Sequence, residues 1–119
     1  MKVKFLSILF IVVSFSLKAQ NETLEDKIVD TIFRLREVKS MSAKIKRETN
    51  GKHHLLVYVD GRPSKEVSYY KIKVWEDNGD TDVTIFEFLV YTNPFEIKYY
   101  DSANDSAISL AKWRKRNEK

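Results

Sequence analysis

Residues 67–92 read VSYYKIKVWEDNGDTDVTIFEFLVYT, and this stretch decides the fold class. It contains two runs in which β-branched and aromatic residues alternate with polar ones, separated by the turn-forming segment Asp77–Asp80. Because successive side chains of a strand point to opposite faces, the runs predict half-buried β-strands at 67–76 and 82–92. The short connection makes these two strands antiparallel neighbours.

The length of the loop between these strands follows from their apolar patterns. One face of the sheet takes six residues: Tyr70, Ile72, Val74, Phe86, Phe88 and Val90. For both sets to share that face, the numbers of paired residues must add up to an even number, and a two-residue Asn78-Gly79 turn gives an odd one. We therefore expect a three-residue loop, Asp77–Gly79, with Gly79 left-handed in a bulge.

Further elements lie on both sides of this hairpin. Strands are predicted at 53–59 and 95–100, next to the turn segments Asp60–Ser64 and Asn93-Pro94. Upstream, four apolar residues recur at helical spacing: Leu24, Ile28, Ile32 and Leu35. They predict one amphipathic helix at about 22–38, with Asn21 as its cap. Residues 39–52 are polar, and the alternation at 40–45 is compatible with another strand.

Together these elements predict an α+β fold, in which one N-terminal helix packs on a four-stranded antiparallel sheet. Residues 20–119 then form a single small domain, because about 100 residues bury enough surface for one modest core. The tail from Ser109, with Leu110 and Trp113, is compatible with a short C-terminal helix.

The sheet face opposite the helix carries more large apolar side chains than a solvated face usually shows. The binding residues that we predict there are Tyr69, Trp75, Ile85, Leu89 and Tyr91. We expect this face to hold a protein or glycan partner. A second reading stays open, in which the tail with Leu110 and Trp113 covers this face and only completes the fold.

Residues 1–19 have the composition of a secretory signal peptide. Lys2 and Lys4 precede an apolar run at 5–17, and small Ala19 offers a cleavage point before Gln20. The run is too short to cross a bilayer of about 30 Å as a helix, and no second apolar segment follows. We expect an exported periplasmic or secreted protein with no stable membrane anchor.

Loss of this leader changes the charge balance. The chain has 21 Lys and Arg against 17 Asp and Glu, and removal of Lys2, Lys4 and Lys18 leaves 18 against 17. A nearly neutral domain lacks the strong basic field that nucleic-acid binding uses, so we expect no nucleic-acid partner. The remaining basic excess is local, at 112–119, where it is read as a solvated tail or as a contact for an acidic surface.

The residue types that carry catalysis are scarce. The chain has no cysteine, which excludes disulfides, a thiol nucleophile and Cys-ligated zinc. Its two histidines, His53 and His54, are adjacent and point to opposite faces of a strand, so they cannot share one metal. No phosphate-binding loop or nucleophile elbow is present in the sequence. We expect no catalytic residues, no metal, no cofactor and no enzyme activity.

The order of one helix followed by an antiparallel meander, over residues 22–100, resembles the cystatin-like class of folds. Cystatin inhibitors present a Gln-x-Val-x-Gly hairpin loop, and Val59 and Gly61 match that motif while Val57 replaces its glutamine. The resemblance implies an alternative function, inhibition of a peptidase through the loop 60–64. Its residues are then Asp60, Gly61, Arg62 and Pro63.

The leader's last residues, Lys18-Ala19-Gln20, and the segments 70–80, 96–101 and 109–114 resemble small exported proteins of Bacteroidota. This resemblance implies a periplasmic or secreted domain and assigns it no activity.

Overall fold

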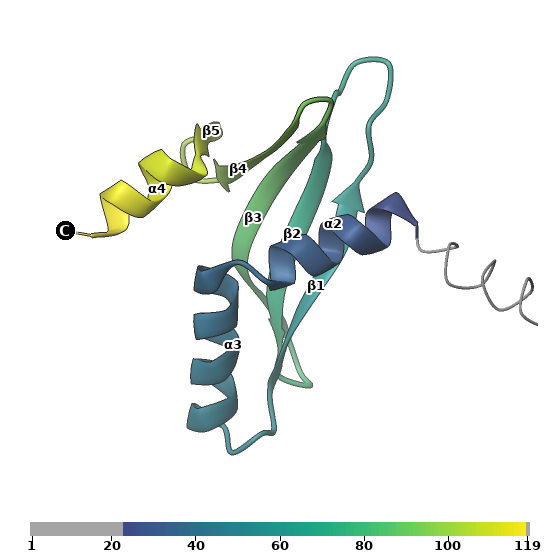
Figure 1. The fold of residues 1–119 in the computed structure, drawn as a ribbon. Coiled ribbons are helices and arrows are strands. Elements are labelled where there is room, and N and C mark those ends of the chain that lie inside the picture. The colour runs from purple at the N-terminus through teal and green to yellow at the C-terminus, as the bar shows by residue number, and fades with distance from the viewer. Residues whose placement is uncertain (1–22, 119) are drawn as a thin grey trace, which may run out of the picture.

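The computed structural model describes residues 23–118, which form an α+β fold of a five-stranded antiparallel sheet and three helices (Figure 1). The sheet has the sequential order β1-β2-β3-β4-β5. Its strands are β1 His54–Gly61, β2 Tyr70–Asp77, β3 Asp82–Thr92, β4 Phe95–Asp101 and β5 Ser106–Ser109. The helices are α2 Leu24–Phe33, α3 Arg36–Glu48 and α4 Leu110–Asn117. The predicted leader at 1–19 and the predicted cap Asn21 lie outside the described residues.

The N-terminal helical region is two helices, so the expectation of one helix at 22–38 is wrong. Helix α2 begins with a capping box, in which Thr23 Oγ1 accepts from the Asp26 amide at 3.1 Å and Asp26 accepts from the Thr23 amide at 3.3 Å. The helix is interrupted at Arg34 and Leu35, and α3 then runs from Arg36 to Glu48.

Helix α3 occupies the segment that was compatible with a strand at 40–45. Val38 and Ile45 are buried seven residues apart, and Met41 packs against the core between them. This spacing is that of one helical face. Residues 40–45 alone fit both the two-residue period of a strand and the helical period of about 3.6 residues. The longer spacing from Val38 to Ile45 is helical, and it is the one that packs against the sheet.

The prediction that β2 and β3 are antiparallel neighbours whose apolar residues share one face is confirmed, because Ile72 pairs with Phe88 and Val74 with Phe86. The predicted three-residue loop is wrong. The connection has four residues, 78–81, and the register shifts at Ile85, so that Trp75 pairs with Thr84. Gly79 does have a positive φ of 88°. The even sum therefore comes from a bulge inside β3 rather than from the turn.

The core lies between the sheet and the helices. Ile28, Ile32, Val38 and Ile45 from the helices pack in one cluster with sheet residues. The buried sheet residues of that cluster are Leu55, Ile72, Val74, Phe88 and Val90. The predicted core face of the sheet is thus confirmed, although Leu24, placed in the core by its spacing, is 49% exposed in the first turn of α2.

The C-terminal region adds β5 and α4, of which the sequence indicated only the helix. Trp113 is buried and stacks on Tyr99 at 4.5 Å between ring centroids, with Phe86 and Phe88 at its edge. All three partners lie on the core face of the sheet. The reading in which Leu110 and Trp113 cover the opposite face is therefore wrong, because both pack into the core cluster.

Candidate functional site

The candidate site is the sheet face that points away from the helices, called the outer face here. Its members follow from strand pairing, since directly opposed residues share a face. They include Leu56, Tyr58, Lys71, Lys73, Trp75, Thr84, Glu87, Leu89, Tyr91, Glu96, Lys98 and Tyr100. Tyr69, just before β2, joins them through its ring contact with Tyr91. Buried residues of α2, α3 and α4 all belong to the core cluster on the other face. Among residues 23–118, these helices therefore leave the outer face uncovered.

One end of the outer face is apolar and open. Trp75 on β2 pairs with Leu56 of the neighbouring strand β1, and its ring meets Tyr58 edge-on at 5.6 Å between centroids. Leu56 is 41% exposed and Tyr58 38% exposed. The indole Nε1 of Trp75 is buried and has no hydrogen-bond partner. This Trp75 patch, made of Leu56, Tyr58 and Trp75, therefore offers accessible apolar surface.

The other end of the outer face is aromatic but occupied by its own side chains. Tyr69 and Tyr91 meet edge-on at 5.5 Å. Lys98 Nζ lies 5.3 Å from the centre of the Tyr91 ring, and Lys71 Nζ lies 5.0 Å from that of Tyr100. The Tyr100 hydroxyl donates to Asp105, which raises the pKa of Tyr100 to about 12. These contacts take up ring faces that a ligand would otherwise use.

Between the two ends lies a covered centre. Leu89 is only 5% exposed, and its direct neighbours across the strands are Lys71 and Lys98. Long lysine stems cover apolar surface while their charged heads stay in water. Lys71 Nζ lies 4.0 Å from Glu87 Oε2, an oxygen that is buried without a hydrogen bond. Leu89 is therefore a supporting residue beneath the face rather than a contact surface.

The bulge at Ile85 reverses the sheet face to which the side chains at the start of β3 point. Ile85 packs against the core cluster, and Val83 pairs with Glu76 on the helix side of the sheet. Ile85 was expected on the outer face, because that expectation assumed unbroken alternation along the strand. Of the five predicted binding residues, the structure thus brings Tyr69, Trp75, Leu89 and Tyr91 to one face and places Ile85 elsewhere.

Leu56 and Tyr58 were not among the predicted binding residues, although they are the most exposed apolar residues of the outer face. The signal was present in His54–Gly61, where Leu55, Val57 and Val59 alternate with these two residues. A strand with apolar residues on both sides marks a second surface besides the core.

The loop of the alternative inhibitor function is partly built into the sheet. Gly61, the last residue of β1, pairs with Lys71 of β2, and Asp60 Oδ2 lies 3.9 Å from Lys73 Nζ. Arg62 donates twice to Glu25 of α2, at 2.7 and 2.8 Å. The exposed tip of the connection is formed further on, where the Ser64 amide donates to the Val67 carbonyl at 2.8 Å. Three of the four predicted loop residues are thus held by strand or helix.

The basic C-terminal segment is partly paired within the domain. Arg114 of α4 donates twice to Glu37 of α3, at 2.7 and 3.0 Å, and this hydrogen bonding holds the pKa of Glu37 at about 2. Arg116 lies 3.7 Å from Asp101. Beside them, a pocket of about 330 Å³ is lined by Ile108, Lys112, Lys115 and Arg116 on the helix side of the sheet. The reading of 112–119 as a free tail therefore does not hold for Arg114.

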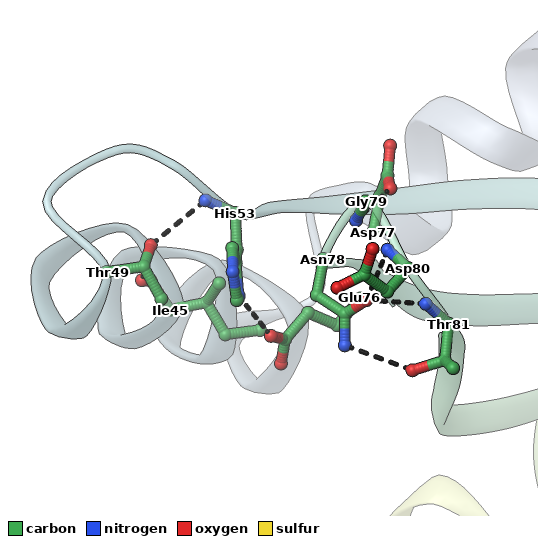
Figure 2. Close-up of polar contacts among 9 residues, drawn as sticks. All are labelled: Ile45, Thr49, His53, Glu76, Asp77, Asn78, Gly79, Asp80 and Thr81. Carbon is green, nitrogen blue, oxygen red and sulfur yellow. Dashed lines mark hydrogen bonds and ion pairs between the residues drawn. The ribbon is translucent and has the colours of Figure 1, made fainter.

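The two histidines lie where β1 begins, His53 just before the strand and His54 as its first residue. Figure 2 shows His53, whose amide donates to Thr49 Oγ1 at 3.1 Å and whose Nδ1 lies 2.7 Å from Glu76 Oε2. In the same view, Asn78 Oδ1 accepts from the amides of Asp80 and Thr81 and fixes the β2–β3 turn. His54 is exposed on β1. Within 23–118, no group of three metal-ligating side chains comes together.

None of the helices in the described part of the chain is long and apolar enough to cross a membrane. No family model matches the chain, and the searches of curated proteins and of solved structures found no match either.

Proposed function

We propose that this protein is an exported, non-catalytic binding domain that holds a partner on its outer face. The observation that carries the proposal is the Trp75 patch. There, Leu56 and Tyr58 expose about two fifths of their surface beside Trp75, on a face that the described helices leave uncovered. Aromatic anchors of this kind supply most of the affinity of protein interfaces.

A protein partner fits this surface better than a glycan. Glycan recognition uses open aromatic faces for stacking, whereas the rings here meet edge-on or lie under lysine ammonium groups. Leu56 adds an aliphatic contact that sugars use poorly and that protein interfaces bury. Lys71, Lys73 and Lys98 form a charged surround next to Glu87 and Glu96. This mixture resembles the polar rim of a protein interface.

The cystatin-like arrangement belongs to the same proposal. An antiparallel sheet with helices on one face supports it, while the break between α2 and α3 and the added β5 and α4 are departures from the simple order of one helix and four strands. The inhibitor function receives less support. A loop inhibitor needs a stiff wedge that projects from the domain, and here Asp60, Gly61 and Arg62 are held against neighbouring elements.

The test is affinity capture from the envelope and culture medium of the producing cell, with the purified full-chain protein as bait. We expect Trp75→Ala to lose a captured protein that wild type retains. Phe95→Ala is the matched control, because Phe95 is an aromatic residue that is 53% exposed on the helix side of the sheet. Loss of the same protein with Phe95→Ala, or no difference between Trp75→Ala and wild type, would contradict the proposal. Loss with Pro63→Glu alone would favour the inhibitor function.

A further inference from the structure

The two edges of the sheet differ in length and protection. β5 has four residues, of which two are serine, and it leads directly into α4. β1 has eight residues and contains neither lysine nor proline, two common protections of an edge strand. A bulge, which is another such protection, interrupts β1 only between Val59 and Gly61, near its end. Among residues 23–118, β1 makes its strand pairing with β2 alone, and no other backbone-to-backbone hydrogen bond reaches it. Alternate residues of β1 therefore present amide and carbonyl groups with which another extended strand can pair.

Exposed apolar side chains gather at this edge. The large apolar residues with high exposure in the described part of the chain number six, and four of them lie on β1 or on α2: Leu24, Phe33, Leu56 and Tyr58. Helix α2 packs against β1 (Figure 1). Four of these six residues thus lie on the edge strand itself or on the helix that contacts it.

The sequence of β1 is complementary to itself in the antiparallel direction. When two copies pair with Val57 opposite Val57, Leu55 faces Val59 and Leu56 faces Tyr58. At the ends of the strand His54 comes opposite Asp60, where the bulge between Val59 and Gly61 ends the regular part of β1. Each pair is apolar with apolar or polar with polar, as cross-strand pairs require.

We propose that a second copy of this chain is the occupant of the β1 edge, in a two-fold symmetric dimer paired antiparallel about Val57. The rotation axis is then perpendicular to the sheet, because opposed residues of paired strands share a face. The helices of both copies stay on one side of a continuous ten-stranded sheet, counted as two sheets of five. The two Trp75 patches lie on the other side, next to each other across the axis.

The test measures the oligomeric state of the purified full chain by sedimentation velocity, from about 10 μM to about 1 mM. We expect a dimer that grows with concentration. Leu56→Lys with Tyr58→Lys places lysine opposite lysine across the axis, and should weaken the dimer at least about tenfold. The matched control is Leu56→Lys with Tyr58→Glu, which removes the same apolar residues but places lysine opposite glutamate, and should keep the dimer. Ala107→Lys on the β5 edge should change nothing.

The register has its own test, because the chain has no cysteine of its own. A mixture of Leu56→Cys chains and Tyr58→Cys chains should give a cross-linked pair with a short thiol reagent, and more of it than either variant alone. A monomer over the whole concentration range would overturn the proposal. So would a dimer that both lysine-containing double variants leave unchanged. Trp75→Ala should keep the dimer even if it loses a captured partner, so the two proposals fail separately.

Discussion

The two faces of strand β3 differ in how apolar side chains are covered. On the helix side, Phe88 is completely buried, and its ring contacts those of Phe86, Tyr99 and Trp113. On the outer face, the next residue, Leu89, is almost as buried, but its cross-strand neighbours are Lys71 and Lys98. Equal burial thus comes from interlocked rings in one case and from flexible charged side chains in the other. The first is dense packing, and the second is a surface that can rearrange when a partner binds.

The largest expected effect is that of Phe88→Ala on stability. Removal of a fully buried ring with three aromatic neighbours leaves a cavity that these rings cannot fill, so the free energy of unfolding should fall by about 3 to 5 kcal/mol. Denaturant melts of the variant and of wild type measure this. A loss below about 1 kcal/mol, typical of a surface site, would show that the helix-side face is not a rigid core.

Leu89→Ala should cost less, about 2 to 3 kcal/mol, although the two residues differ little in exposure. The reason is the nature of the cover, because lysine stems can collapse into the space that a leucine leaves. The same melts test this, with Leu89→Met as a control that nearly keeps the volume. If Leu89→Ala cost as much as Phe88→Ala, the outer face would be packed as tightly as the core.

Glu37 extends the comparison to the contact between α3 and α4. Its pKa of about 2 in the folded protein lies below its ordinary value of 4.5, because Arg114 donates two hydrogen bonds to it. A lowered carboxyl pKa stabilises the fold above pH 4.5, and that stability is lost as the pH falls toward 2. Glu37→Gln should therefore cost about 1 to 2 kcal/mol at neutral pH. It should also flatten the fall in stability between pH 4.5 and 2 relative to wild type. An unchanged pH profile would mean that Arg114 does not hold Glu37 in solution.

Much of the sheet could be predicted from the sequence because alternation is a local property. The β3 and β4 boundaries and the core face of β2, β3 and β4 follow from it directly. The bulge at Ile85 could not be predicted from alternation. A shift of the pairing by one residue can lie in the loop or in the strand, and it restores the same register in either place. Its position decides that Ile85 packs inward, so the wrong placement of Ile85 among the predicted binding residues follows from it.

Tertiary packing explains the remaining differences. The break at Leu35 and the start of α3 carry no glycine or proline that would mark them in the sequence. The two helices bury both Ile32 and Val38 against one sheet. In one straight helix these two side chains would point in different directions, so only one of them could contact the sheet. Trp113 is a single aromatic residue in a basic segment, and only the stacked Tyr99 ring shows which side of the sheet it covers. Such side choices depend on three-dimensional contacts and leave no periodic signal.

The smallest expected effect concerns Leu56, where the outer face meets the β1 edge. At about 10 μM, where we expect the monomer to predominate, Leu56→Ser should change the free energy of unfolding by about 1 kcal/mol or less, because Leu56 is already 41% exposed. At about 1 mM the same substitution should lower the melting temperature, since a dimer adds stability that grows with protein concentration. Thr84→Ala, an outer-face change on an inner strand, should show no such concentration dependence. Calorimetry at the two concentrations separates the cases. A large loss at low concentration would mean that Leu56 belongs to the core, and equal small losses at both would leave the apolar edge of β1 without a second copy to cover it.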